Sequence, residues 1–165
     1  MSTTVRDWAT VRHFTPAEWL YDPDRVEWDV VLLLDEQRDA HALTLPGVRY
    51  VVHCAWEAGG HDAADSSHYG ALATAVDYHA EVAGVPVPLL DLWLHAERFP
   101  WSGVGLYPHW YSPGLHCDLR RLGRDHPSLG KRWWRDVPTP EGKPNYKSLD
   151  RELLRLLLAR EEVMP

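Results

Sequence analysis

Apolar residues recur at three- and four-residue spacing in three stretches of the chain, a pattern that predicts amphipathic helices. In the first stretch Val26, Val30 and Leu34 would share one buried face, while Asp35 would face water. A shorter helix is predicted at Thr15-Pro16-Ala17-Glu18, because these residues form a capping box with proline at the first helical position. The three longer predicted helices cover residues 24–43, 87–98 and 149–161.

Runs of β-branched and aromatic residues, bounded by turn residues, predict four short strands. The last two runs are close enough along the chain to pair as an antiparallel hairpin. Helices placed before and between such strands are typical of an α+β fold, and we expect a small antiparallel sheet with helices packed on one side. The predicted strands cover residues 49–54, 74–78, 104–107 and 115–119.

The chain of 165 residues is the length of one domain, with no internal repeat and no interdomain linker. Residues 1–120 hold most of the predicted elements, and the core is expected from about residue 13. Residues 121–147 are basic and proline-rich and are predicted to be irregular. The last helix, capped by Ser148, is too short to be stable alone, so we expect it to dock on the same domain. Its apolar residues are Leu153, Leu154, Leu156, Leu157 and Leu158.

Composition narrows the function classes. The chain has 17 basic and 24 acidic residues and a net charge of −7, which argues against nucleic acid as a partner. No apolar stretch is long enough to span a membrane, and the first residues lack the apolar region of a signal peptide. The two cysteines, Cys54 and Cys117, are predicted to be free.

Two segments combine histidine with aspartate in a pattern that can bind a metal ion. His68 lies in a polar stretch that precedes the strand carrying Asp77. In the later strand, His116 and Asp118 would point to the same face because side chains alternate, while Cys117 would point to the other face. His68, Asp77 and His116 as ligands leave the fourth position of zinc open for water, which is typical of a catalytic site.

These segments resemble motifs of the zinc D-alanyl-D-alanine carboxypeptidases and related phage endolysins, whose fold is shared with the hedgehog signalling domain. The family motif S-x-H-x-x-G-x-A-x-D is similar to Ser66-Ser67-His68 followed by Ala75-Val76-Asp77. The closing H-x-D motif is similar to Gly114-Leu115-His116-Cys117-Asp118, and the short helix at 13–19 also resembles the family. The resemblance covers about residues 13–120. It implies a hedgehog-like peptidase fold and Zn²⁺ bound by His68, Asp77 and His116.

The chain departs from the family pattern at three places. His68 and Asp77 are nine residues apart, where the family spacing is seven. Trp56 and Glu57 stand where relatives have an arginine that anchors the substrate, which favours an endopeptidase over a carboxypeptidase. Pro113 occupies the position of the catalytic acidic residue that many relatives carry three residues before the last histidine ligand.

The identity of the general base is therefore left open by the sequence. Asp118 is the first candidate, with His109 and Glu57 as alternatives, and a role for Asp118 in orienting a ligand is an equal expectation. Ser66 is expected to cap or orient the metal loop, and His79, two residues after Asp77, is expected to line the site or to lie on the surface.

The resemblance implies a zinc-dependent peptidase that cleaves peptide stems or cross-links of peptidoglycan. Without a signal peptide, such an enzyme is expected to be a monomeric phage-type lysin that stays in the host cytoplasm before release, or a component of the phage particle. The alternative is a non-catalytic cell-wall-binding or virion-structural domain of the same fold, which the altered spacing and Pro113 favour. Neither a nucleic acid nor a membrane is expected as a partner.

Overall fold

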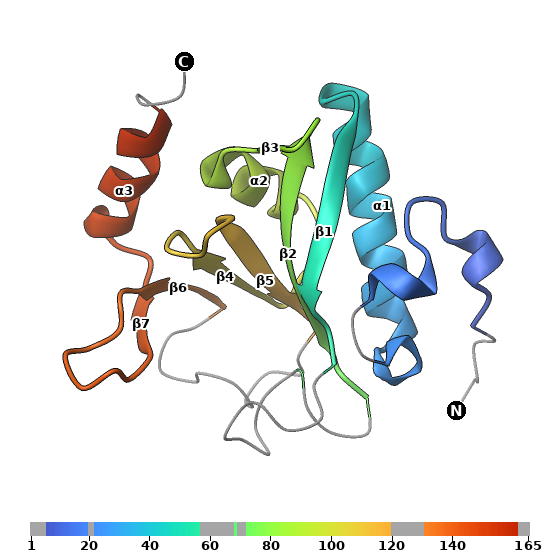
Figure 1. Ribbon diagram of the computed structural model, residues 1–165, viewed down its shortest axis with the longest axis horizontal. Coiled ribbons are helices and arrows are strands. Elements are labelled where there is room, and N and C mark those ends of the chain that lie inside the picture. The colour runs from blue at the N-terminus through green and yellow to red at the C-terminus, as the bar shows by residue number, and fades with distance from the viewer. Residues whose placement is uncertain (1–5, 20–21, 57–67, 69–71, 120–130, 162–165) are drawn as a thin grey trace.

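The computed structural model describes residues 6–19, 22–56, 68, 72–119 and 131–161 (Figure 1). Within these residues, three α-helices and a seven-stranded mixed sheet form an α+β fold. The helical elements are the 3-10 turns η1 (Trp8–Thr10), η2 (Pro16–Glu18) and η3 (Pro23–Arg25) and the α-helices α1 (Trp28–Thr44), α2 (Leu89–Ala96) and α3 (Arg151–Glu161). The strands are β1 (Val48–Cys54), β2 (Ala75–Val82), β3 (Val85–Pro86), β4 (Gly103–Tyr107), β5 (Gly114–Asp118), β6 (Arg132–Asp136) and β7 (Asn145–Ser148).

The sheet has the strand order β1-β2-β5-β4-β6-β7, and β3 pairs with β2. Every pairing is antiparallel except that of β4 with β6, which is parallel. The prediction of an antiparallel sheet is therefore wrong for the β4–β6 pair, and the prediction of an irregular segment at 121–147 is wrong where β6 and β7 form. The backbone groups on the outer edge of β4 are paired by β6, and this tertiary requirement overrides the weak local strand signal of residues 132–136.

Two predicted elements have different bounds for local reasons. The predicted strand 74–78 continues to Val82, where Ala83 and Gly84 adopt positive φ angles of 51° and 82° and turn the chain into β3. The predicted helix 24–43 begins only at Trp28, because Val26 forms an isolated bridge with Ala73. The capping box at Thr15 is present, but it starts a single 3-10 turn.

All three α-helices contribute to one core on one face of the sheet. Tyr50, Tyr78 and Leu115, from neighbouring strands, share this face and are at most 1% exposed. Leu34 of α1, Leu92 of α2 and Leu153 of α3 belong to the same buried cluster. The helices therefore lie on one side of the sheet, as the sequence predicted.

Two acidic side chains, Asp35 and Asp150, accept backbone N–H groups in a way that the sequence did not predict. Asp35, predicted to face water, is only 4% exposed, because its carboxylate accepts the backbone N–H groups of Arg12 and His13 at 3.1 and 2.8 Å. Ser148 ends β7, and Asp150 instead accepts the backbone N–H of Leu153 at 2.9 Å at the start of α3. Both corrections follow from carboxylates that satisfy orphan N–H groups.

The opposite face of the sheet carries the candidate chemistry. Asp77, His116, Gly105 and Trp133 are consecutive register partners on β2, β5, β4 and β6, so their side chains share this face. A Cβ atom at Gly105 would come within 2.6 Å of the Trp133 indole, so glycine is required for this indole to lie across β4. The Trp133 ring is 5.5 Å from the His116 ring and forms one wall of the site.

In the described part of the chain, none of the helices has the length and apolar character needed to cross a membrane. Cys54 and Cys117 are both free thiols, as predicted. The two exposed leucines of α3, Leu154 and Leu158, are 48% and 55% exposed, whereas Leu153 and Leu157 are buried. The C-terminal helix therefore docks through one side only.

Candidate metal centre

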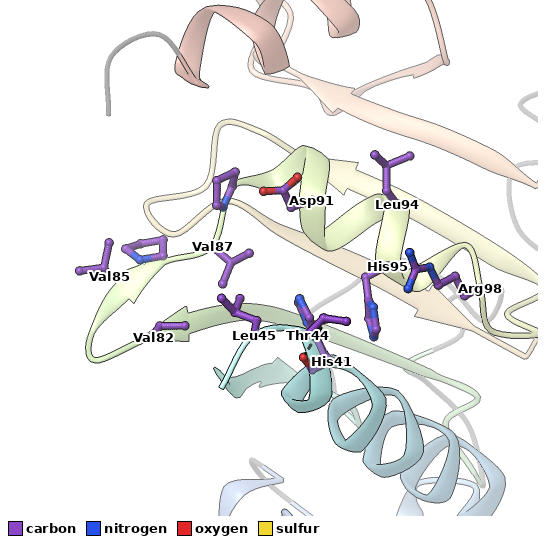
Figure 2. A pocket seen from close by; sticks show the side chains of 12 residues that line it. His41, Thr44, Leu45, Val82, Val85, Val87, Asp91, Leu94, His95 and Arg98 are labelled. Carbon is purple, nitrogen blue, oxygen red and sulfur yellow. Dashed lines mark hydrogen bonds between the residues drawn. The ribbon is translucent and has the colours of Figure 1, made fainter. Parts of the chain in front are cut away.

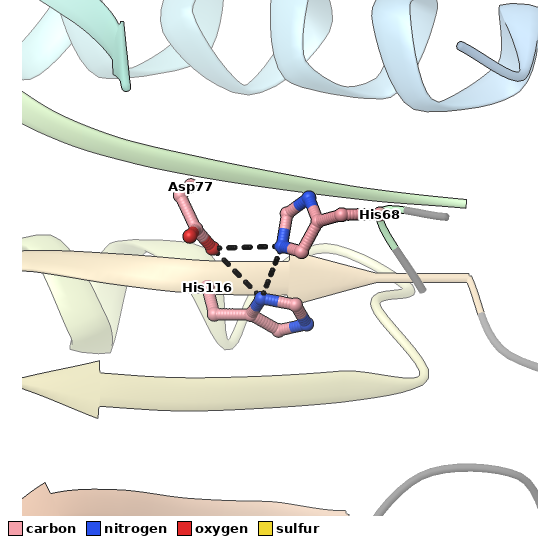
Figure 3. A group of neighbouring side chains, drawn as sticks. All are labelled: His68, Asp77 and His116. Carbon is pink, nitrogen blue, oxygen red and sulfur yellow. Dashed lines mark hydrogen bonds and ion pairs between the residues drawn. The ribbon is translucent and has the colours of Figure 1, made fainter. Parts of the chain in front are cut away.

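Three side chains from separate parts of the chain meet on the face of the sheet that the helices leave open (Figure 3). Asp77 of β2 and His116 of β5 are direct register partners, and His68 precedes β2. Asp77 Oδ1 is 2.7 Å from His116 Nδ1 and 3.2 Å from His68 Nε2, and the two ring nitrogens are 3.0 Å apart. The structure thus brings together the three ligands predicted from the sequence.

The outward nitrogens of both rings have acceptors that determine where the protons lie. His68 Nδ1 donates to the backbone carbonyl of Ala55 at 2.9 Å, and His116 Nε2 donates to Asp118 Oδ2 at 3.2 Å. A neutral imidazole carries one proton, so His68 Nε2 and His116 Nδ1 each present a lone pair to the cluster. Together with the Asp77 carboxylate, three acceptor atoms converge, and only a proton or a cation can satisfy them.

The electrostatics of the buried cluster lead to the same conclusion. His68 and His116 are 5% and 6% exposed. Burial alone would lower the pKa of His68, but the Asp77 carboxylate outweighs burial and raises this pKa well above its usual value. The pKa of His116 is also raised, because hydrogen bonds to Asp118 and Asp77 outweigh burial. In return, both imidazoles lower the pKa of Asp77 against the effect of its own burial. The cluster therefore attracts positive charge.

The arrangement can hold a metal ion. Two imidazole nitrogens and one carboxylate oxygen are ligands that zinc accepts, and other divalent transition metals share this preference. The Ala55 carbonyl and the Asp118 carboxylate lie behind the two rings, the usual position of groups that orient histidine ligands.

The other predicted site residues fall into three groups. Asp118 is fully buried and contacts the outward nitrogen of His116, so it lies behind the ligand. His109 is not brought into the cluster, because it lies in the turn after β4 and pairs with Asp136 at 3.4 Å. Ser66 and Glu57 lie outside the described residues.

A second histidine pair lies beside the cluster. His79, predicted to line the site or to lie on the surface, is buried and shares the strand face of Asp77, and its Nδ1 is 2.7 Å from His53 Nε2. Burial lowers the pKa of both residues. The Trp110 ring lies edge-on to His53 at 5.6 Å and stacks on Tyr107 at 4.1 Å. These four side chains form a histidine-aromatic wall next to the metal ligands.

The sequence analysis assigned no role to His53, and the reason is a local irregularity. The register between β1 and β2 shifts between Val52 and Cys54, so simple alternation along β1 does not place His53 relative to β2. The only sequence signal is the histidine itself at the end of a strand. The Cys54 thiol, also unassigned, hydrogen-bonds with His68 and contributes to raising its pKa.

Comparisons of the chain with protein-family models, with curated proteins and with solved structures found no match. The evidence that this cluster can hold a metal ion therefore comes only from the residues of this chain. The hedgehog-like peptidase fold remains a prediction from the motifs.

Proposed function

We propose that this chain is a zinc-dependent peptidase that acts on the peptide stems or cross-links of peptidoglycan. One observation carries the proposal: Asp77 Oδ1 and the inner ring nitrogens of His68 and His116 converge within 3.2 Å, while the outward nitrogens face the Ala55 carbonyl and the Asp118 carboxylate. The choice of peptidoglycan as the substrate, and of a phage lysin as the type of enzyme, rests on the motif resemblance.

The donor set supports zinc. Three protein ligands leave one position of a tetrahedral ion for water or substrate, as in catalytic zinc sites. When bound, zinc supplies a Lewis acid for the scissile carbonyl and lowers the pKa of a coordinated water. The chain supplies the orientation, because the Ala55 carbonyl and the Asp118 carboxylate hold the two imidazoles with their lone pairs inward.

The geometry favours Asp118 as a positioning residue rather than as the general base. Its Oδ2 atom is 3.2 Å from the outward nitrogen of His116, and the residue has no exposed surface. A carboxylate in this position raises the basicity of a histidine ligand and fixes the orientation of its ring. Of the alternative bases, His109 is engaged with Asp136, and Glu57 lies outside the described residues.

The histidine-aromatic wall of His53, His79, Tyr107 and Trp110 supplies a surface for a peptide substrate. His79 is two residues from Asp77 on the same strand face, a separation of roughly 7 Å. Aromatic rings and imidazoles pack against peptide groups and can also donate hydrogen bonds to carbonyl oxygens. A peptide bound at the metal ligands would extend along this wall.

The experiment is a metal assay combined with hydrolysis of purified peptidoglycan. We expect about one zinc ion per chain and the release of new amino groups from the peptidoglycan. His116→Ala should lose both zinc and hydrolysis. His109→Ala is the matched control and should keep both, because His109 lies outside the cluster. Stoichiometric zinc in His116→Ala would contradict the proposed ligand set.

A second candidate, a cell-wall-binding or virion-structural domain without turnover, is favoured by two observations. Pro113 stands where relatives have a catalytic acidic residue, and Asp118 is engaged behind His116. This candidate predicts zinc binding and cosedimentation with peptidoglycan, but no release of amino groups. The hydrolysis assay therefore separates the two functions.

A further inference from the structure

The helix side of the sheet contains a pocket of about 530 Å³. Figure 2 shows the side chains that line it. The pocket lies between the end of α1, the β2–β3 hairpin and α2. Its walls are mainly apolar and include Leu45, Val87 and Leu94. His41 of α1 and His95 of α2 line it with their rings. Because Val82 of the pocket and Asp77 of the cluster point to opposite faces of β2, the pocket is independent of the proposed function.

The two imidazoles of the pocket form a stacked and nearly buried pair. Their ring centroids are 4.0 Å apart and the rings are inclined by only 16°. His41 and His95 are 5% and 6% exposed. Burial lowers the pKa of His41 to about 4 and also lowers the pKa of His95, so both rings are neutral at pH 7. A neutral imidazole offers one donor and one acceptor.

The hydrogen-bond partners around His41 determine which of its ring nitrogens carries the proton. Trp101 donates its indole N–H to Gln37 Oε1 at 2.7 Å, which fixes the amide orientation of Gln37. Gln37 Nε2 then donates to the hydroxyl oxygens of Tyr50 and Tyr78 at 3.3 and 2.6 Å. Among the described residues, the Tyr50 O–H has one acceptor, His41 Nδ1 at 2.9 Å. His41 therefore carries its proton on Nε2, as a donor on the side away from Tyr50.

The hydrogen bonds of His95 leave it with an unused acceptor rather than an unused donor. Its Nε2 is 3.0 Å from the backbone carbonyl of Gln37, which can only accept, so Nε2 carries the proton. His95 Nδ1 is then an acceptor. Within the described residues, neither His41 Nε2 nor His95 Nδ1 has a hydrogen-bond partner in the protein. The stacked rings thus present one unused donor and one unused acceptor in a mainly apolar pocket.

We propose that this pocket binds a small neutral molecule that carries a primary amide or lactam edge on an apolar body. The carbonyl oxygen of such an edge accepts from His41 Nε2, and its adjacent N–H donates to His95 Nδ1. The apolar body packs against Leu45, Val87 and Leu94, which line the pocket. A hydrocarbon would leave both nitrogens unsatisfied, so it binds less well.

The test uses ε-caprolactam as the probe and the full chain at pH 7, with the ring nitrogens of His41 and His95 followed by NMR. We expect saturable shifts of both rings on titration. The matched ligand is ε-caprolactone, which has the same shape but no N–H, and we expect it to bind at least about tenfold more weakly because His95 Nδ1 remains unsatisfied. Equal binding of lactam and lactone would overturn the proposal, as would the absence of saturable shifts.

A variant at the pocket mouth provides the second control. Leu94 is 54% exposed, so Leu94→Arg is expected to fold while its longer side chain obstructs the apolar wall. This variant should weaken caprolactam binding at least about tenfold, while the stacked imidazoles keep their own hydrogen bonds. Unchanged binding in Leu94→Arg would show that the shifts arise elsewhere and would overturn the proposal. Zinc content and hydrolysis should not change, which keeps this test separate from that of the proposed function.

Discussion

Two pairs of buried histidines lie on opposite faces of the same sheet, and their protonation differs because their partners differ. His68 and His116 face Asp77, and this carboxylate raises the pKa of both rings despite their burial. His41 and His95 stack on each other instead of pairing with a carboxylate. Burial, together with the nearby Arg98 charge, lowers the pKa of both, that of His41 to about 4. Similar burial therefore produces a cation-binding cluster on one face and a neutral hydrogen-bonding pair on the other. The Asp77 carboxylate makes this difference for His68, and Asp118 and Asp77 together make it for His116.

The largest effect is expected from Asp77→Asn, which removes that carboxylate and leaves the side-chain shape. We expect loss of stoichiometric zinc, with affinity reduced by roughly 100-fold or more, because ligand losses exceed those of orienting groups. In the metal-free protein, the pKa of His68 should fall toward those of the His41–His95 pair, whereas that of His116 should fall less because Asp118 remains. Zinc titration calorimetry and NMR titration of the imidazoles measure the two effects. A His68 pKa that stays raised in Asp77→Asn would contradict the assigned cause.

The second-largest effect is expected on the free energy of unfolding, from a substitution in the core. Leu153→Ala should reduce the free energy of unfolding by about 2–5 kcal/mol, because Leu153 is 1% exposed in the core. Leu154→Ala is the control and should change it by less than about 0.5 kcal/mol, since Leu154 is 48% exposed. Urea denaturation measures both. Zinc affinity should remain that of the parent protein, which would show that the cluster depends on its local partners.

A smaller effect is expected from Asp118→Asn. If Asp118 orients His116, the variant should bind zinc roughly 10–100-fold more weakly and lose hydrolysis in proportion to zinc occupancy. Excess zinc should then restore much of the hydrolysis. If Asp118 is the general base, zinc affinity stays normal, while hydrolysis falls by roughly 10²–10⁴-fold and does not recover. Zinc titration of the hydrolysis rate distinguishes the two roles.

The smallest effect is the acid sensitivity of the His41–His95 pair. The pKa of His41 is lower in the folded chain than its ordinary value of 6.5, so the unfolded chain binds more protons below pH 6.5. The contribution of His41 to stability is therefore present above pH 6.5 and is lost as the pH falls toward about 4. Urea denaturation between pH 7 and pH 4 should show a shallower pH dependence for His41→Gln than for the parent chain. Identical pH dependences would remove His41 as the cause.

The sequence was sufficient to predict the candidate ligands because their chemistry is visible in residue type and strand alternation. His116 and Asp77 lie on strands that were predicted within a few residues, and their register follows from antiparallel pairing. The three α-helices were also predicted, since each has an apolar face. What remained open was the role of Asp118, because strand alternation places it on the face of His116 but does not reveal the 3.2 Å contact with the outward ring nitrogen.

The remaining features depend on contacts between distant segments. His53 pairs with His79 across an irregular register, which local patterns do not encode. Asp35 appeared to be a surface residue because its two N–H partners lie 22 and 23 positions earlier in the chain. The strand signal at 132–136 is weak by itself, and these residues become a strand because β4 offers a free edge. In each case a contact between distant segments, and not the local sequence pattern, determines where the residue lies.

The parallel pairing of β4 with β6 has a consequence for synthesis of the chain. A ribosome that has released residues 1–119 has supplied β1 to β5 but not β6, so β4 is then an edge strand. All five residues of β4 are buried in the finished protein, and its backbone is not protected by charged side chains or proline. Such an edge readily pairs with another chain. The nascent protein therefore passes through an aggregation-prone stage, which ends when residues 132–136 emerge and dock beside β4.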